Sequence, residues 1–182
     1  MKNKEHKTLR IKGVEVDGLV NEFCEKLLNV GFELAENKYV YGKELKGTFL
    51  GVEDSEFGLC SFPETNLIHR VDISMPIIYS YDRPISKYFR IKNLLSEEYG
   101  KPVIEDDIIE KYRYLPNDEI DKKIKDGDLR LYCKFCIDVG WVDMLLSNES
   151  LGMTMFNLKN YEYSKRLLLE KEMELEIKDI KQ

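Results

Sequence analysis

The chain has 182 residues, of which 43% are apolar and 34% charged, and its formal net charge is −6. This length fits one ordinary domain of roughly 100–200 residues, and the composition is typical of a folded globular chain. The acidic balance and the dispersed Lys and Arg residues argue against nucleic acid as a partner, because phosphate-backbone binding needs a clustered basic surface.

The beginning of the chain has no recognisable secretory signal. Residues 1–12 are polar and basic, without the apolar central stretch of a signal peptide. No apolar run approaches the roughly 20 residues that a membrane-spanning helix needs. We therefore expect a cytoplasmic protein without a membrane span, whose four cysteines are reduced thiols.

The first half of the predicted domain, residues 9–80, begins with a helix. Over residues 18–30 apolar side chains recur at helical spacing, with Asp17 placed to cap the start of the helix and Gly31 to end it. Three strand candidates follow, and the polar run at residues 53–56 is predicted to be the turn between the first two. The strand candidates cover residues 45–52, 57–62 and 67–75.

The third strand candidate contains one of the two histidines of the chain. Side chains alternate between the two faces of a strand. His69 is therefore expected to share a face with Val71 and Ile73, and Arg70 and Asp72 are expected on the opposite face.

The second half, residues 84–160, has the same order of elements. A helix is predicted between Ser86 and Gly100, and Pro102 prevents its continuation. Residues 103–128 are charged and contain turn signals, so we expect an insertion or a mobile loop there. Three further strand candidates cover residues 129–138, 141–147 and 151–158.

This order of elements predicts an α+β fold. Two α-β-β-β halves would build one antiparallel sheet with the helices packed on one face. Residues 1–160 then form a single domain, and residues 161–182 are predicted to form a C-terminal helix.

The predicted C-terminal helix carries a narrow apolar stripe among Glu and Lys residues. The stripe consists of Leu169, Met173, Ile177 and Ile180. We expect the apolar side chains of such a stripe to be buried against another surface, and two interpretations stay open. Either the helix folds back on its own sheet, or it contacts another chain, which is a protein partner or a second copy of this one.

Three short segments of the chain carry a distinctive pattern. They are IKGV at residues 11–14, LKGTFLG at residues 45–51 and EYGKP at residues 98–102, joined by the pair of strands that meets at Gly140. Together they resemble a group of small uncharacterised α+β proteins abundant in Bacteroidetes, and the likeness covers most of residues 9–160. The resemblance implies an architecture similar to the tandem helix-plus-sheet repeats of β-lactamase-inhibitor-type proteins, which act mainly through protein contacts.

Cys133 and Cys136 have a spacing at which two thiolates can bind one metal ion. In an extended strand, however, residues three apart point to opposite faces, and the chain has no second Cys or His pair at a suitable distance. We expect Cys133 to lie inward beside Leu131 and Phe135. The sequence predicts no metal site and no cofactor.

No catalytic motif is recognisable, and we predict no catalytic residue. We instead predict a non-enzymatic binding or protein-interaction module that uses the face of the sheet opposite the helices, since Arg and Tyr are enriched in protein interfaces. The predicted binding residues are Arg130, Tyr132, Lys134, Arg70 and Asp72.

Two other functions stay open. A small enzyme would need His69, Cys60 and Asp72 to converge in a pocket. A small-molecule carrier would use residues 103–128 as a lid over an apolar cavity.

Overall fold

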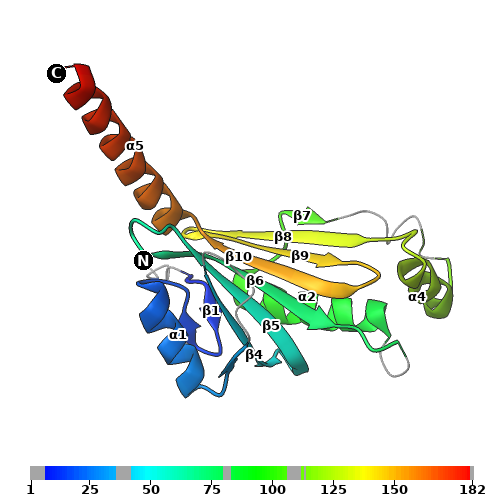
Figure 1. Cartoon of the computed structure of the whole chain (residues 1–182). Helices are drawn as coiled ribbons and strands as arrows, with labels where there is room; N and C mark the ends of the chain where they lie inside the picture. The colour runs from blue at the N-terminus through cyan, green and yellow to red at the C-terminus, as the bar shows by residue number, and fades with distance from the viewer. Residues whose placement is uncertain (1–6, 36–41, 80–82, 106–111, 113, 181–182) are drawn as a thin grey trace, which may run out of the picture.

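Strands dominate the structure, and the C-terminal helix projects from the end of the sheet (Figure 1). The structure is a computed structural model that describes residues 7–35, 42–79, 83–105, 112 and 114–180. For residues 175–180 it describes the backbone only.

Eight strands form one antiparallel sheet, and two more form a separate hairpin. The sheet strands are β3 (Glu33–Leu34), β4 (Gly42–Phe49), β5 (Val52–Ser61), β6 (Ile68–Pro76), β7 (Ile104–Glu105), β8 (Leu131–Ile137), β9 (Gly140–Leu146) and β10 (Ser150–Asn157). Their order in space is β3-β4-β5-β6-β10-β9-β8-β7, so β6 and β10 pair at the centre. The hairpin consists of β1 (Arg10–Ile11) and β2 (Val14–Glu15).

Each half of the sheet follows its own helix in the chain. The described helices are α1 (Val20–Asn29), α2 (Pro84–Tyr99), α4 (Asn117–Lys125) and α5 (Leu158–Ile180). α1 packs against β5, α2 packs against β8 and β9, and both contribute to the same hydrophobic core. None of the described helices is both long and apolar enough to cross a membrane. The predicted α+β fold, with its antiparallel sheet and C-terminal helix, is confirmed.

One row of apolar side chains crosses the sheet on the face that the helices cover. Its members are neighbours in the strand register, and each is at most 1% exposed. They are Leu59, Val71, Met155, Val142 and Phe135. Leu27 of α1 and Ile91 of α2 are also fully buried, so the two halves share one core.

The predicted turn at residues 53–56 is wrong, because these residues lie inside β5. The hairpin turn is formed by Leu50 and Gly51, whose φ angles are 49° and 74°. Positive φ at both central residues suits the two-residue turn whose twist matches that of the strands. Ser55 occupies a buried position because its hydroxyl donates a hydrogen bond of 2.9 Å to the carbonyl of Val52.

The predicted insertion or mobile loop at residues 103–128 contains regular structure in its described part. It includes the edge strand β7 and the helix α4, which packs against α2 with Ile120 and Ile124 buried. Asp121 of α4 accepts a hydrogen bond of 2.9 Å from the backbone N–H of Ile85 in the first turn of α2. Two apolar residues in a short charged segment are too weak a periodic signal to predict a helix.

Buried polar contacts fix the base of α5. Asn160 Nδ2 donates hydrogen bonds of 2.8 Å to Asp17 Oδ1 and to the carbonyl of Ile68. The hydroxyl groups of the buried Ser164 and of Thr65 lie 2.7 Å apart. Asp17 thus binds α5, and its predicted role as the cap of α1 is wrong, since α1 begins without a side-chain cap. These contacts set the direction in which α5 leaves the end of the sheet (Figure 1).

Candidate binding face

The face of the sheet opposite α1 and α2 carries polar and aromatic side chains, and we call it the open face. Asp72, Thr154, Asp143 and Lys134 form a row across β6, β10, β9 and β8, because the register pairs each residue with the next. All four side chains are half-buried. The sheet therefore presents charged groups on a continuous surface that spans both halves.

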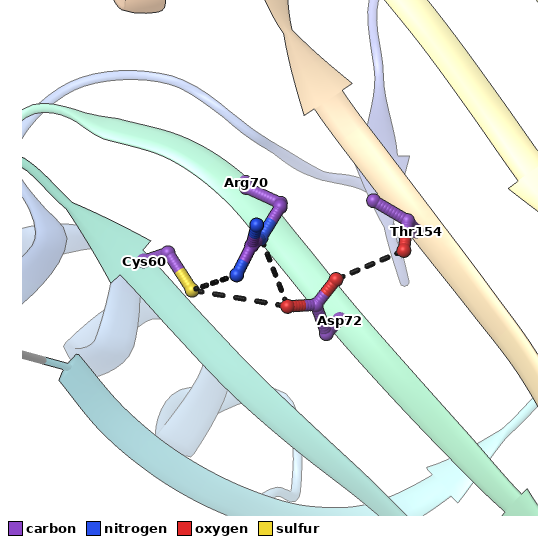
Figure 2. A network of polar contacts seen from close by, with 4 residues as sticks. All are labelled: Cys60, Arg70, Asp72 and Thr154. Atoms are coloured by element: carbon purple, nitrogen blue, oxygen red, sulfur yellow. Dashed lines mark hydrogen bonds and ion pairs between the residues drawn. The ribbon is translucent and has the colours of Figure 1, made fainter. Parts of the chain in front are cut away.

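Figure 2 shows the first polar network of the open face, which joins β5, β6 and β10. Arg70 Nε lies 2.9 Å from Asp72 Oδ2, and Thr154 Oγ1 donates a hydrogen bond of 2.9 Å to Asp72 Oδ1. Arg70 Nη2 also donates to Cys60 Sγ at 3.5 Å, and the Cys60 thiol donates to Asp72 Oδ2 at 3.9 Å. Both carboxylate oxygens of Asp72 therefore have partners, and three strands hold the side chains in place.

The Cys60 thiol in this network is poorly suited to nucleophilic chemistry. Burial raises the pKa of Cys60; Arg70 opposes this rise, and the charge of Asp72 adds to it. The thiolate is the nucleophilic form of cysteine. Cys60 is therefore held as a protonated thiol that donates a hydrogen bond.

A second polar network occupies the β8–β9 part of the open face. Tyr132 donates a hydrogen bond of 2.6 Å from its hydroxyl to Asp143 Oδ1, and Lys134 Nζ lies 3.6 Å from the same oxygen. Lys134 Nζ also lies 4.2 Å from the centroid of the Trp141 ring, which is a cation–π geometry. Burial and the hydrogen bond to Asp143 both raise the pKa of Tyr132, so its hydroxyl stays protonated at neutral pH.

Four aromatic residues and a histidine form a cluster on the open face beside the base of α5. The rings of Trp141 and Phe156 stack with centroids 4.1 Å apart and an interplanar angle of 12°. Tyr161 of α5 lies 5.1 Å from Phe156, and His69 stacks on Phe62 at 4.7 Å. His69 also lies 5.8 Å from Tyr161, so this aromatic cluster joins the sheet to the helix.

The prediction that His69 lies on the apolar face of its strand is wrong. Cys60 pairs with Arg70 but Ser61 pairs with Ile68, so β6 has one extra residue opposite β5. This β-bulge shifts the alternation of side chains by one position and places His69 in the aromatic cluster. Burial lowers the pKa of His69, and the charge of Arg70 lowers it further, so the imidazole is neutral at neutral pH.

The structure brings together four of the five residues predicted for the binding face. Arg70 and Asp72 belong to the first polar network, and Tyr132 and Lys134 belong to the second. Arg130 lies directly before β8 and is exposed. The row through Thr154 and Asp143 connects the two networks across the sheet.

Several residues of the open face were not predicted. Trp141 and Asp143 flank the buried Val142, and Phe156 follows the buried Met155, so strand alternation carried a signal for these three. Tyr161 contributes from α5, and only the fold reveals that it packs against the sheet.

A hollow of about 570 Å³ lies over the β3–β6 part of the open face. Gly58 and Ser74 give this hollow a shallow floor, and Glu44, Lys46 and Glu56 line it as well. Short side chains between charged ones therefore leave this part of the open face hollow.

The two other functions find less support in these contacts. Cys60 and Asp72 contact each other, whereas His69 packs against Phe62 and Tyr161 in the aromatic cluster. For the carrier, the described helix of the predicted lid, α4, packs against α2.

The cysteine pair has the predicted geometry. Cys133 is buried, as are Leu131 and Phe135 on the same side of β8, whereas Cys136 is exposed. Within the described residues, no group of three or more His, Cys, Asp or Glu side chains is arranged to hold a metal ion.

The apolar stripe of α5 is exposed where its side chains are described. Leu169 and Met173 are 50% and 54% exposed, and the side chains of Ile177 and Ile180 lie outside the described residues. The interpretation that this stripe folds back on its own sheet is therefore wrong for Leu169 and Met173.

No known protein family, curated protein or solved structure matches this chain.

Proposed function

We propose that the protein is a non-enzymatic protein-binding module whose open face contacts another protein. One observation carries this proposal. A stacked Trp141–Phe156 pair lies next to polar networks whose side chains are already held by one another.

Side chains that are already held in place favour binding, because ordering flexible side chains on association costs free energy. Immobilising a flexible interface side chain costs about 0.5–1.5 kcal/mol. Arg70 and Lys134 are already paired with carboxylates across neighbouring positions of the sheet. Trp, Tyr and Arg are also the residues that most often dominate binding energy in interfaces.

The protonation states support binding over catalysis. Cys60 is held as a thiol and His69 as a neutral imidazole, whereas an activated cysteine nucleophile needs thiolate character.

Site-specific photo-cross-linking in native cells tests the proposal. A benzophenone amino acid would replace Ser74, which is exposed on the open face beside Asp72 but belongs to neither polar network. The matched control places it at Glu22, which is exposed on α1. We expect a discrete cross-linked protein from position 74 that is absent from position 22. The same products from both positions, or none from position 74, would contradict the proposal.

A further inference from the structure

The outer part of α5 is a surface separate from the open face. The buried Asn160 and Ser164 fix the base of α5. The outer part runs from Lys165 to the end of the helix and has 16 residues, which corresponds to about 24 Å at 1.5 Å per residue. Figure 1 shows this part projecting from the end of the sheet.

This projecting part carries apolar side chains in water. Leu169 and Met173 are one helical turn apart, which places them on the same side of the helix, and each is about half exposed. The anchored base directs the helix away from the sheet, so the part of the chain that the structure describes leaves these two side chains about half exposed.

The charges of α5 are unevenly distributed along the helix. Residues 159–168 include three basic residues and one acidic residue, whereas residues 169–180 include two basic and five acidic residues. The base of the helix is therefore positive and its outer end negative. Two such helices attract each other when they run in opposite directions and repel each other when they run in parallel.

We propose that α5 pairs in antiparallel orientation with α5 of a second copy of this chain. The register that pairs the two apolar side chains described as exposed places Leu169 of each copy opposite Met173 of the other. Position 166 then lies opposite position 176, which brings Arg166 toward the position of Glu176 twice in a symmetric dimer. A parallel pair would instead place Arg166 opposite Arg166.

Sedimentation velocity of the full chain over a range of concentrations up to several hundred micromolar tests this pairing. We expect a concentration-dependent dimer, since two helices of this length form a small interface. Leu169→Glu should abolish the dimer. Arg166→Glu should weaken it by about tenfold or more, because it replaces two attractive contacts by two repulsive ones.

Charge exchange distinguishes the orientation. Glu176→Arg alone should weaken the dimer like Arg166→Glu, and the double variant should restore it, because each contact is then again between opposite charges. Lys171→Glu is the matched control, since it changes the charge as much as Arg166→Glu does but stands on the side of α5 away from Leu169. Circular dichroism would verify that each variant is folded. A wild-type chain that stays monomeric, equal effects of Arg166→Glu and Lys171→Glu, or a double variant no better than the single ones would overturn the proposal.

Discussion

Thr154 of β10 and Asp72 of β6 are hydrogen-bonded at 2.9 Å although they lie 82 positions apart in the sequence. The bond crosses the central strand pair, at which the two halves of the sheet meet. It therefore links the first polar network of the open face to the half of the sheet that carries the second one.

Removal of this bond should destabilise the fold modestly. Thr154→Val keeps the β-branched shape but removes the donor to Asp72, and we expect a loss of about 0.5–1.5 kcal/mol in the free energy of unfolding. Ser74→Ala, on the exposed part of the same face, is the control. Urea denaturation curves would measure both, and equal midpoints for the two variants would mean that the bond does not stabilise the fold.

Truncation of the shared core should have a larger effect. Leu27 and Ile91 are fully buried in α1 and α2, so Leu27→Ala and Ile91→Ala should each cost about 2–5 kcal/mol. Leu94→Ala, on the same helix as Ile91 but 38% exposed, should cost much less. Midpoints of denaturation near the wild-type value for the two core variants would show that the helices bury other faces.

Stability should fall on mild acidification because of His69. Its pKa is lowered in the folded state by burial and by Arg70, so the unfolded chain binds a proton more readily than the folded one. The contribution of neutral His69 to stability is then fully present above the ordinary histidine pKa of about 6.5. It decreases as the pH falls toward the lowered pKa of His69 in the folded state. His69→Phe should reduce this loss between pH 7 and pH 5. An NMR titration of His69 with a midpoint at or above 6.5 would be inconsistent with this account.

Cys60 and Cys136 should differ in their reactivity toward an alkylating reagent. Cys60 is half-buried with a raised pKa, whereas Cys136 is exposed. At pH 7.5 iodoacetamide should therefore modify Cys136 faster than Cys60, as followed by mass spectrometry of peptides. Faster modification of Cys60 would indicate an activated thiol and would favour the alternative of a small enzyme.

The helices of the core could be predicted because their signals are local. Apolar spacing and the terminal residues Gly31 and Gly100 mark the ends of α1 and α2 within one or two positions. The β-bulge at His69 could not be predicted, since it exists only in the pairing of β6 with β5.

The candidate site depends even more on long-range pairing. Alternation within one strand predicts that Tyr132 and Lys134 share a face. It could not predict that they contact Asp143 and Trp141 of the next strand. The pairing of β6 with β10, which joins Asp72 to Thr154, leaves no local signal in the sequence.

The most direct test of the binding face compares the affinity of the cross-linked partner for the wild-type chain with its affinity for Trp141→Ala, a variant of the aromatic cluster. Trp141 stacks on Phe156 and contacts Lys134, and its side chain is half-buried. Isothermal titration calorimetry with the purified partner should show that Trp141→Ala weakens binding by about tenfold or more, as expected for a residue that dominates an interface. Leu94→Ala, a change on the outer side of α2, should leave the affinity unchanged. Equal affinities of the wild-type chain and Trp141→Ala, or a loss confined to Leu94→Ala, would contradict the assignment of the open face as the binding surface.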